Sequence, residues 1–196
     1  MICGVAKEVD KIVESELRSA SARNYMMDRA FVVMMDPNTG DVLAMSGKKM
    51  DGRDVTDYAI GTFTTQYEMG SVVKGATVLG GYQDGMSHNQ SYMDTPLFFF
   101  AGSGGKPKQS YKVLGWVNDI QALQKSSNVY MFQVAMRMAA LLIKRMVRYQ
   151  QDLEHLQKMR NYYAQFGLGV KTGIDLPQES SGDADASEDG RRTFAR

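Results

Sequence analysis

Ser71 and Lys74 lie three residues apart in the run Tyr67-Glu-Met-Gly-Ser-Val-Val-Lys74. On a helix, side chains at this spacing share one face, so the serine hydroxyl and the lysine amine can meet. A serine hydroxyl becomes a strong nucleophile only when a base takes its proton. Lysine can be that base if burial or a helix N-terminus lowers its pKa well below about 10.4. The pair therefore permits acyl transfer through serine, but by itself it is a weak signal, because a capping serine beside a solvated lysine gives the same pattern more often.

Three other segments bear on this choice. Ser126-Ser-Asn128 places short polar side chains between two helix-prone stretches, where a loop can present them to a cleft. Upstream lies Asp28-Arg-Ala-Phe-Val-Val-Met-Met-Asp-Pro-Asn-Thr-Gly-Asp-Val-Leu-Ala-Met45, and downstream lies Phe166-Gly-Leu-Gly-Val-Lys-Thr-Gly-Ile-Asp-Leu-Pro177.

Together and in this order, the four segments resemble the transpeptidase domain of penicillin-binding proteins. The similarity is nearest to the high-molecular-weight class B proteins of Gram-positive bacteria, and it runs from about Lys11 to Pro177. Met69 stands where the family usually has proline. The resemblance implies an α/β (α+β) fold of the serine β-lactamase/transpeptidase kind, with helices around an antiparallel sheet that is incomplete here.

The resemblance also implies roles for four residues. Ser71 would attack the D-Ala-D-Ala end of a peptidoglycan stem peptide, form an acyl-enzyme, and be acylated by β-lactams. Lys74 would take and relay the serine proton. Ser126 would pass a proton to the leaving group, and Asn128 would hold the substrate amide and Lys74. This chemistry needs no metal or other cofactor.

Lys171-Thr-Gly173 spells the third motif of the family. Its context, however, is that of a separate structural box in which the lysine position varies, and it follows the second motif too closely. We therefore expect the true third motif to lie outside this chain, so that penicillin labels it weakly or not at all. Residues 1–177 are interpreted as a partial transpeptidase domain, and residues 178–196 as a disordered tail unrelated to the family.

The chain must also form the elements that position these residues. Apolar spacing and turn residues predict both the helices and the strands. The expected elements are a helix from Val5 to about Ala20; a hairpin of residues 30–35 and 42–45; a loop over 48–57; a helix from Ser71 that Gly80-Gly81 ends; loops and short strands over 82–115; a helix from about Asn118 to Lys125; and helix over 128–166, broken near Gln151–Asp152 with Asp152 as a cap, and ended by Gly167.

Composition excludes several classes of function. The net charge is +1, which argues against nucleic acid as a partner. One cysteine and two histidines argue against a disulfide framework and a zinc site. No apolar run approaches the roughly 18–20 residues of a membrane span, and the N-terminus does not look like a signal peptide. By resemblance, the parent protein would work at the outer face of the plasma membrane with the wall-synthesis machinery.

Three alternatives stay open. A serine β-lactamase or carboxypeptidase of the same superfamily would use the same nucleophile and differ in how fast water removes the acyl group. A catalytically inactive binding or assembly module would keep the fold without the chemistry. A sheet deprived of strands could also fail to fold stably, because exposed strand edges favour aggregation.

Overall fold

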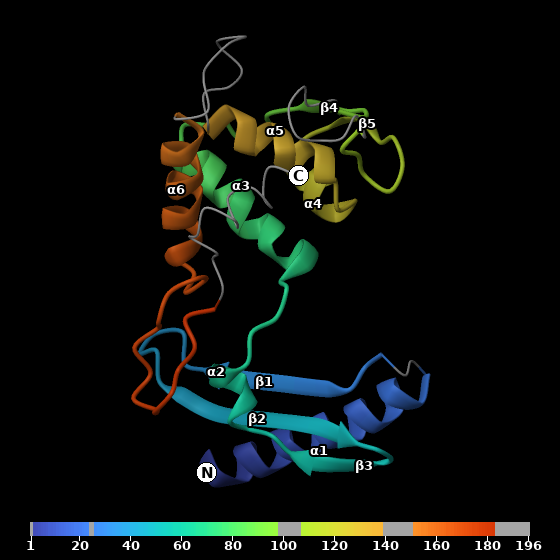
Figure 1. Cartoon of the computed structure of the whole chain (residues 1–196), viewed down its shortest axis with the longest axis vertical. Helices are drawn as coiled ribbons and strands as arrows, with labels where there is room; N and C mark the ends of the chain where they lie inside the picture. The colour runs from blue at the N-terminus through green and yellow to red at the C-terminus, as the bar shows by residue number, and fades with distance from the viewer. Residues whose placement is uncertain (1, 24–25, 98–106, 139–150, 183–196) are drawn as a thin grey trace. The chain divides into compact units, whose positions relative to one another are not determined.

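The computed structural model describes residues 2–23, 26–97, 107–138 and 151–182 of the chain. These residues form two compact units (Figure 1). The first comprises the residues up to Gln66 together with Gly173–Ser180, and the second comprises Tyr67–Thr172 with Ser181 and Gly182. The division into a partial domain over 1–177 and a disordered tail stays a prediction, and residues 183–196 lie outside the described residues.

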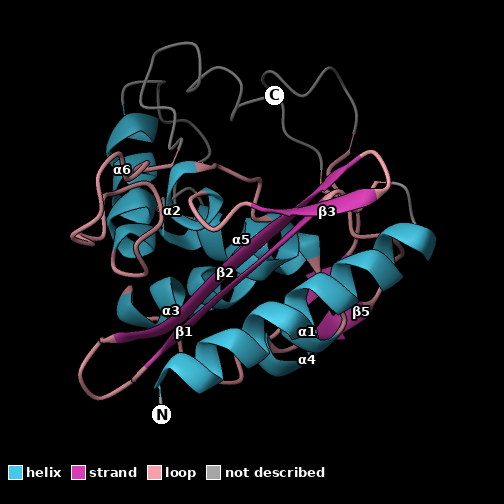
Figure 2. Ribbon diagram, turned by 90° about the horizontal axis from the view of Figure 1, so that it is seen from below, coloured by secondary structure: helices cyan, strands magenta, loops and turns pink. Residues whose placement is uncertain are grey.

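The first unit is a three-stranded antiparallel sheet in the order β1-β2-β3, with one long helix along it (Figure 2). The helix has an apolar stripe, and its residues Val13 and Leu17 are buried, as is Ala44 of the sheet. The predicted N-terminal helix is thus confirmed and is slightly longer than expected. The elements are α1 (Ile2–Arg23), β1 (Arg29–Met35), β2 (Val42–Asp51), β3 (Asp54–Asp57) and α2 (Gly61–Thr64).

The predicted hairpin between β1 and β2 is confirmed. Its turn is organised by Asp36, whose carboxylate accepts a hydrogen bond from the Asn38 amide at 2.8 Å. Gly40 has φ +80°, a left-handed conformation that glycine adopts without a steric penalty.

The loop expected over residues 48–57 is wrong. β2 continues to Asp51, and β3 pairs with it in antiparallel register from Asp54. Gly52, with φ +62°, allows the tight turn between the strands. Residues 48–57 are too polar to show the apolar alternation that predicts a strand. Charged contacts, rather than apolar burial, stabilise side chains of this segment.

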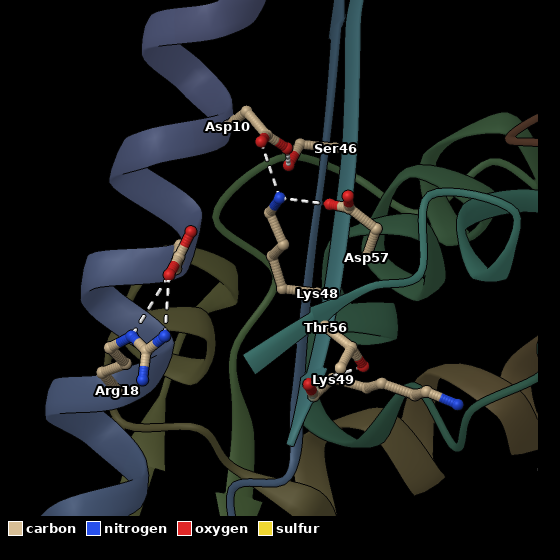
Figure 3. A network of polar contacts seen from close by, with 8 residues as sticks. Asp10, Arg18, Ser46, Lys48, Lys49, Thr56 and Asp57 are labelled. Atoms are coloured by element: carbon tan, nitrogen blue, oxygen red, sulfur yellow. Dashed lines mark hydrogen bonds and ion pairs between the residues drawn. The ribbon is translucent and has the colours of Figure 1, made fainter. Parts of the chain in front are cut away.

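Lys48 is the centre of these contacts (Figure 3). It is buried, and its Nζ donates to Asp10 of α1 at 2.6 Å and to Asp57 of β3. Ser46 donates to the other carboxylate oxygen of Asp10 at 2.8 Å. Burial alone would lower the pKa of Lys48, but the hydrogen bonds to the two aspartates outweigh it and raise that pKa. The network ties the helix to two strands.

We expect Lys48→Met to lower the free energy of unfolding by no more than about 1 kcal/mol at neutral pH, because both partner carboxylates reach solvent. Hydrogen bonds from Lys48 and then Ser46 lower the pKa of Asp10 below 3.8. The contribution of Asp10 is therefore present above that pH and lost as the pH falls through the lowered pKa. Hydrogen exchange of the β2 amides at neutral pH and in acid measures both effects. A loss above about 3 kcal/mol would instead indicate a fully desolvated pair.

The second unit packs helices around a small core and a two-stranded antiparallel sheet. Three methionines contribute to this core, where their unbranched side chains can fill irregular gaps. The core consists of Val78, Met86, Val117, Ala122, Tyr130, Met131, Val134 and Met138. The elements are a 3₁₀ turn η1 (Gly70–Val73), α3 (Lys74–Gln83), β4 (Tyr92–Asp94), β5 (Gly115–Val117), α4 (Asp119–Gln124), α5 (Asn128–Met138) and α6 (Gln151–Ala164).

Gly80 and Gly81 do not end the helix that follows Ser71, so that expectation is wrong. α3 continues through both glycines to Gln83. A Cβ atom on Gly81 would lie 2.8 Å from Cγ1 of Val134 in α5, and one on Gly80 would lie 3.2 Å from the ring of Tyr162 in α6. The glycines are therefore needed for close packing between helices rather than for a stop.

The remaining helices follow the predicted order. Asn118 caps α4 by accepting from the Gln121 amide at 2.9 Å, which confirms the expected start. The described part of α5 ends at Met138 and that of α6 begins at Gln151, and residues 139–150 between them lie outside the described residues. The side chain of Asp152, the expected cap, also lies outside them. α6 ends at Ala164, three residues before Gly167 with φ +75°.

Candidate active site

Ser71 and Lys74 lie at the junction of η1 and α3. Ser71 is exposed in the 3₁₀ turn, whereas Lys74 opens α3 and its residue is only 8% exposed. Met69, which precedes the turn, has φ −69°. That is the φ value which proline fixes, so methionine preserves the helix start where the family has proline.

Ser126 lies in the loop between α4 and α5, Asn128 is the first residue of α5, and both meet Lys74. The Lys74 ammonium donates to the Ser126 carbonyl and hydroxyl oxygens, each at 2.8 Å, and to Oδ1 of Asn128 at 2.7 Å. The Ser126 hydroxyl in turn donates to Oγ of Ser71 at 3.1 Å. The structure thus brings together all four residues that the sequence singled out.

The side chains of Ser71 and Lys74 are connected only indirectly, although the Lys74 backbone amide donates to the Ser71 carbonyl. Sequence spacing predicts that their side chains can meet, but in the described part of the chain no hydrogen bond joins them, and the path runs through Ser126. As they stand, these hydrogen bonds run from the charged Lys74 through Ser126 to Ser71. When Lys74 is neutral and both bonds reverse, the Ser126 hydroxyl gives a proton leaving Ser71 a route to Lys74.

A strained turn presents Ser126. The amides of Ser126 and Ser127 donate to the Leu123 and Ala122 carbonyls, at 3.2 and 2.8 Å, in the hydrogen-bond pattern of a Schellman motif. Glycine usually occupies the left-handed position of this motif, yet Ser126 occupies it with φ +54°. Strained backbone of this kind concentrates at functional sites. A serine directly after a short predicted helix was the only sequence sign of this geometry.

The amide side chain of Asn128 is oriented from both ends. Its Oδ1 accepts from Lys74, and its Nδ2 donates to the Gln109 carbonyl at 3.3 Å. The backbone amide of Asn128 donates to the Ser110 hydroxyl at 2.9 Å. Sequence reasoning did not single out Gln109 or Ser110, because neither belongs to a recognisable motif.

Lys171 is exposed in the segment after α6. Within the described ranges it makes no hydrogen bond to Ser71, Lys74, Ser126 or Asn128. Its assignment to a structural box rather than to the site stays a prediction. The described residues also contain no group of three or more histidine, cysteine or acidic side chains placed to hold a metal ion.

Burial sets the chemistry of Lys74. Desolvation disfavours the charged amine and lowers the pKa of Lys74 from its ordinary value of 10.5. A lysine with a lowered pKa is more often neutral and can then accept a proton. The environment of Lys74 therefore suits a base.

We expect Lys74 to titrate below 10.5 in the folded chain, and we expect acylation of Ser71 to accelerate as the pH rises through that midpoint. The unfolded chain holds this proton more tightly, so the same group adds stability as the pH rises from the lowered pKa towards 10.5. NMR of the lysine side chains measures the midpoint, with the Lys74 signal assigned by its loss in Lys74→Arg. Titration at or above 10.5 would contradict a role as base.

Comparison with known proteins agrees with this geometry. Residues 30–194 match the family described as penicillin binding protein transpeptidase domain, so the chain belongs to this family. It is 59% identical over 178 residues to penicillin-binding protein H of Bacillus subtilis, and 46% identical over 183 residues to penicillin-binding protein 2A of the same organism. These alignments cover 89% and 90% of this chain but 25% of each relative.

A solved structure shows the same fold. Penicillin-binding protein 2B of Streptococcus pneumoniae superposes with a TM-score of 0.82 at 30% identity, over 98% of this chain and 33% of that one. The predicted fold class is thereby confirmed. The chain spans about a quarter of the length of the curated relatives that it matches. Among the described helices, none combines the length and the apolar character that crossing a membrane requires.

Proposed function

We propose that the protein is a peptidoglycan D,D-transpeptidase that cross-links cell-wall stem peptides through an acyl-serine intermediate and binds β-lactams. One observation carries the proposal: the hydrogen-bonded series from Ser71 through Ser126 to a buried Lys74. It supplies a nucleophile, a proton path and a base with a lowered pKa. Family membership supports the peptide substrate.

The reaction uses these groups in sequence. Ser71 gives its proton to neutral Lys74 by way of the Ser126 hydroxyl, and its oxygen attacks the carbonyl carbon of the penultimate D-Ala. The peptide C–N bond breaks, and Ser126 passes the proton to the nitrogen of the departing D-Ala. The amine of a second stem peptide then attacks the ester, which forms the cross-link and returns the proton to Ser71. Asn128 holds the substrate amide and orients Lys74 throughout.

The setting of this activity is part of the proposal. Enzymes that build the wall work where its precursors are exported, so we place the protein at the outer face of the plasma membrane, with other wall-synthesis proteins as partners. Family membership supports this placement.

A time course with fluorescent penicillin tests the function. The hydrogen-bonded path from Ser71 to Lys74 favours weak labelling over none. We therefore expect slow, substoichiometric labelling of this chain, since the described site has no basic side chain besides Lys74 in the hydrogen-bonded set, and we expect the adduct to persist. Rapid hydrolysis of the drug would indicate a β-lactamase instead. A chain that unfolds cooperatively but never forms an adduct would indicate a binding module, and fast stoichiometric labelling would show that the site is already complete.

A further inference from the structure

A buried carboxylate lies next to the Ser126–Asn128 loop, and the mechanism above does not use it. Asp94 ends β4 and is 1% exposed. Its Oδ2 accepts hydrogen bonds from the hydroxyls of Ser110, at 2.7 Å, and Ser127. In the ranges that the structure describes, no lysine or arginine contacts this carboxylate. Burying a charge among neutral donors costs free energy, so its presence here calls for a physical reason.

The carboxylate fixes the direction of two hydroxyl protons. A serine hydroxyl has a single proton and two acceptor lone pairs. Because Ser110 and Ser127 both donate to Asp94, their lone pairs are left to accept from other groups. Hydrogen bonds to an ionised acceptor are stronger than those between neutral groups, so the carboxylate holds both orientations firmly.

Those lone pairs accept hydrogen bonds from the first backbone amides of α5. The Ser110 oxygen accepts from the amides of Asn128, at 2.9 Å, and Val129, at 3.3 Å, while the Ser127 oxygen accepts from the Tyr130 amide at 2.9 Å. The first amides of a helix have no partner within the helix. The negative charge of Asp94 near this helix start is also favourable for the helix dipole.

The start of α5 also forms part of the candidate active site. Asn128 opens α5 and presents Oδ1 to Lys74, and Ser126 lies two residues before it in a strained conformation. Further contacts hold β4 against α5: the Gln133 side chain donates to the Met93 carbonyl at 3.0 Å, and the Tyr92 and Tyr130 rings pack edge to face at 5.2 Å. Hydrogen bonds therefore connect Asp94 through Ser110 to the Asn128 amide, and Asp94 also holds Ser127, the chain neighbour of Ser126.

We propose that Asp94 is a positioning residue, which acts through Ser110 and Ser127 to hold Ser126 and Asn128 against Lys74. This inference rests on the proposed function, since it explains how that site keeps its geometry. Asp94 touches neither the nucleophile nor the base. Its effect on the reaction comes from the placement of the residues that do.

Three variants separate positioning from general stability. Asp94→Ala removes the oxygen that accepts from both serine hydroxyls. Ser110→Ala removes the link to the Asn128 amide with a smaller perturbation. Asp94→Asn keeps an oxygen that can accept from both hydroxyls. Asp119→Asn is the matched control. Asp119 is also a buried carboxylate, and it accepts from the Tyr82 hydroxyl at 2.5 Å and the Asn89 amide at 2.9 Å, but it makes no hydrogen bond to residues 126–130.

The first measurement is the NMR titration of Lys74, which does not depend on acylation. We expect Asp94→Ala and Ser110→Ala to move the Lys74 midpoint towards 10.5, because a loosened loop admits water to the amine, and to speed hydrogen exchange at the amides of residues 128–130. Asp94→Asn should change both less than Asp94→Ala does, because its neutral oxygen accepts the same hydroxyls more weakly, and Asp119→Asn should leave both unchanged. An unchanged midpoint in Ser110→Ala and in any Asp94→Ala chain that folds, or an equal shift in Asp119→Asn, would overturn the proposal.

The second measurement is the rate of penicillin adduct formation at Ser71. We expect Asp94→Ala to slow it about 10- to 100-fold, as small displacements of positioned groups do. Asp94→Asn should restore the rate to within about threefold, because it keeps the acceptor. Absence of any adduct in the unaltered chain would count against the proposed function alone, and the Lys74 titration would still decide the role of Asp94. An Asp94→Asn rate as low as that of Asp94→Ala would contradict positioning through the hydroxyls.

Discussion

Lys74→Ala is expected to reduce adduct formation at Ser71 by about 10²- to 10⁴-fold, the usual contribution of a positioned general base. Because weak labelling is expected for the unaltered chain, this reduction would place the adduct of the variant below detection. The physical reason is that Lys74 is the one amine in the hydrogen-bonded set and the only member whose burial lowers its pKa. Without it the Ser71 proton has a path but no base at the end of the path. Mass spectrometry of the intact chain after long exposure to penicillin measures the loss.

Two further variants show which property of Lys74 matters. Lys74→Arg keeps a cation that can donate to Ser126 and Asn128, but arginine does not give up its proton. We expect this variant to be as inactive as Lys74→Ala. Lys112→Ala, which removes an exposed lysine of the same unit, should label like the unaltered chain. Substantial labelling of Lys74→Arg would mean that the positive charge, not the base, is the essential feature.

Gly81→Ala is expected to destabilise the second unit by about 1–3 kcal/mol, the usual cost of overpacking a core. The added Cβ would lie 2.8 Å from Cγ1 of Val134, a fully buried and β-branched side chain that has little freedom to move. It would also lie 3.1 Å from Cε of Met86. Urea unfolding followed by circular dichroism gives the change in the free energy of unfolding.

Gly75→Ala is the matched control in the same helix. A Cβ at this position meets no atom within 4 Å, so only the helix propensity changes. We expect this variant to be more stable by about 0.5–1 kcal/mol, because alanine favours the helix over glycine. The two substitutions should thus have opposite signs. Equal effects at both positions would show that contact between α3 and α5 is not what requires Gly81.

The sequence predicted those parts of the molecule that local patterns encode. The spacing of Ser71 and Lys74 allows their side chains to share one face, and the resemblance of four ordered segments to the transpeptidase family assigns roles to this pair and to Ser126 and Asn128. All four lie together in the structure. The first hairpin was predictable because Asp36-Pro-Asn-Thr-Gly40 is a strong local turn signal.

Features that depend on distant parts of the chain were not predictable. Gly80 and Gly81 suggested a helix stop because glycine often ends helices, but their role is set by Val134 and Tyr162, which come much later in the sequence. β3 was missed because its polar residues follow no alternation.

Asp94 was missed for a related reason. It lies in no motif, and its importance follows only from the two serines that surround it in space.

The most direct test of the central claim is the location of the penicillin adduct. The chain and its Ser71→Ala variant are incubated with the drug for the same extended time, digested, and mapped by peptide mass spectrometry, with folding of both checked by unfolding curves. The account predicts a persistent acyl group on Ser71 and none in the variant. An adduct on another residue, or equal labelling of a folded Ser71→Ala chain, would contradict it.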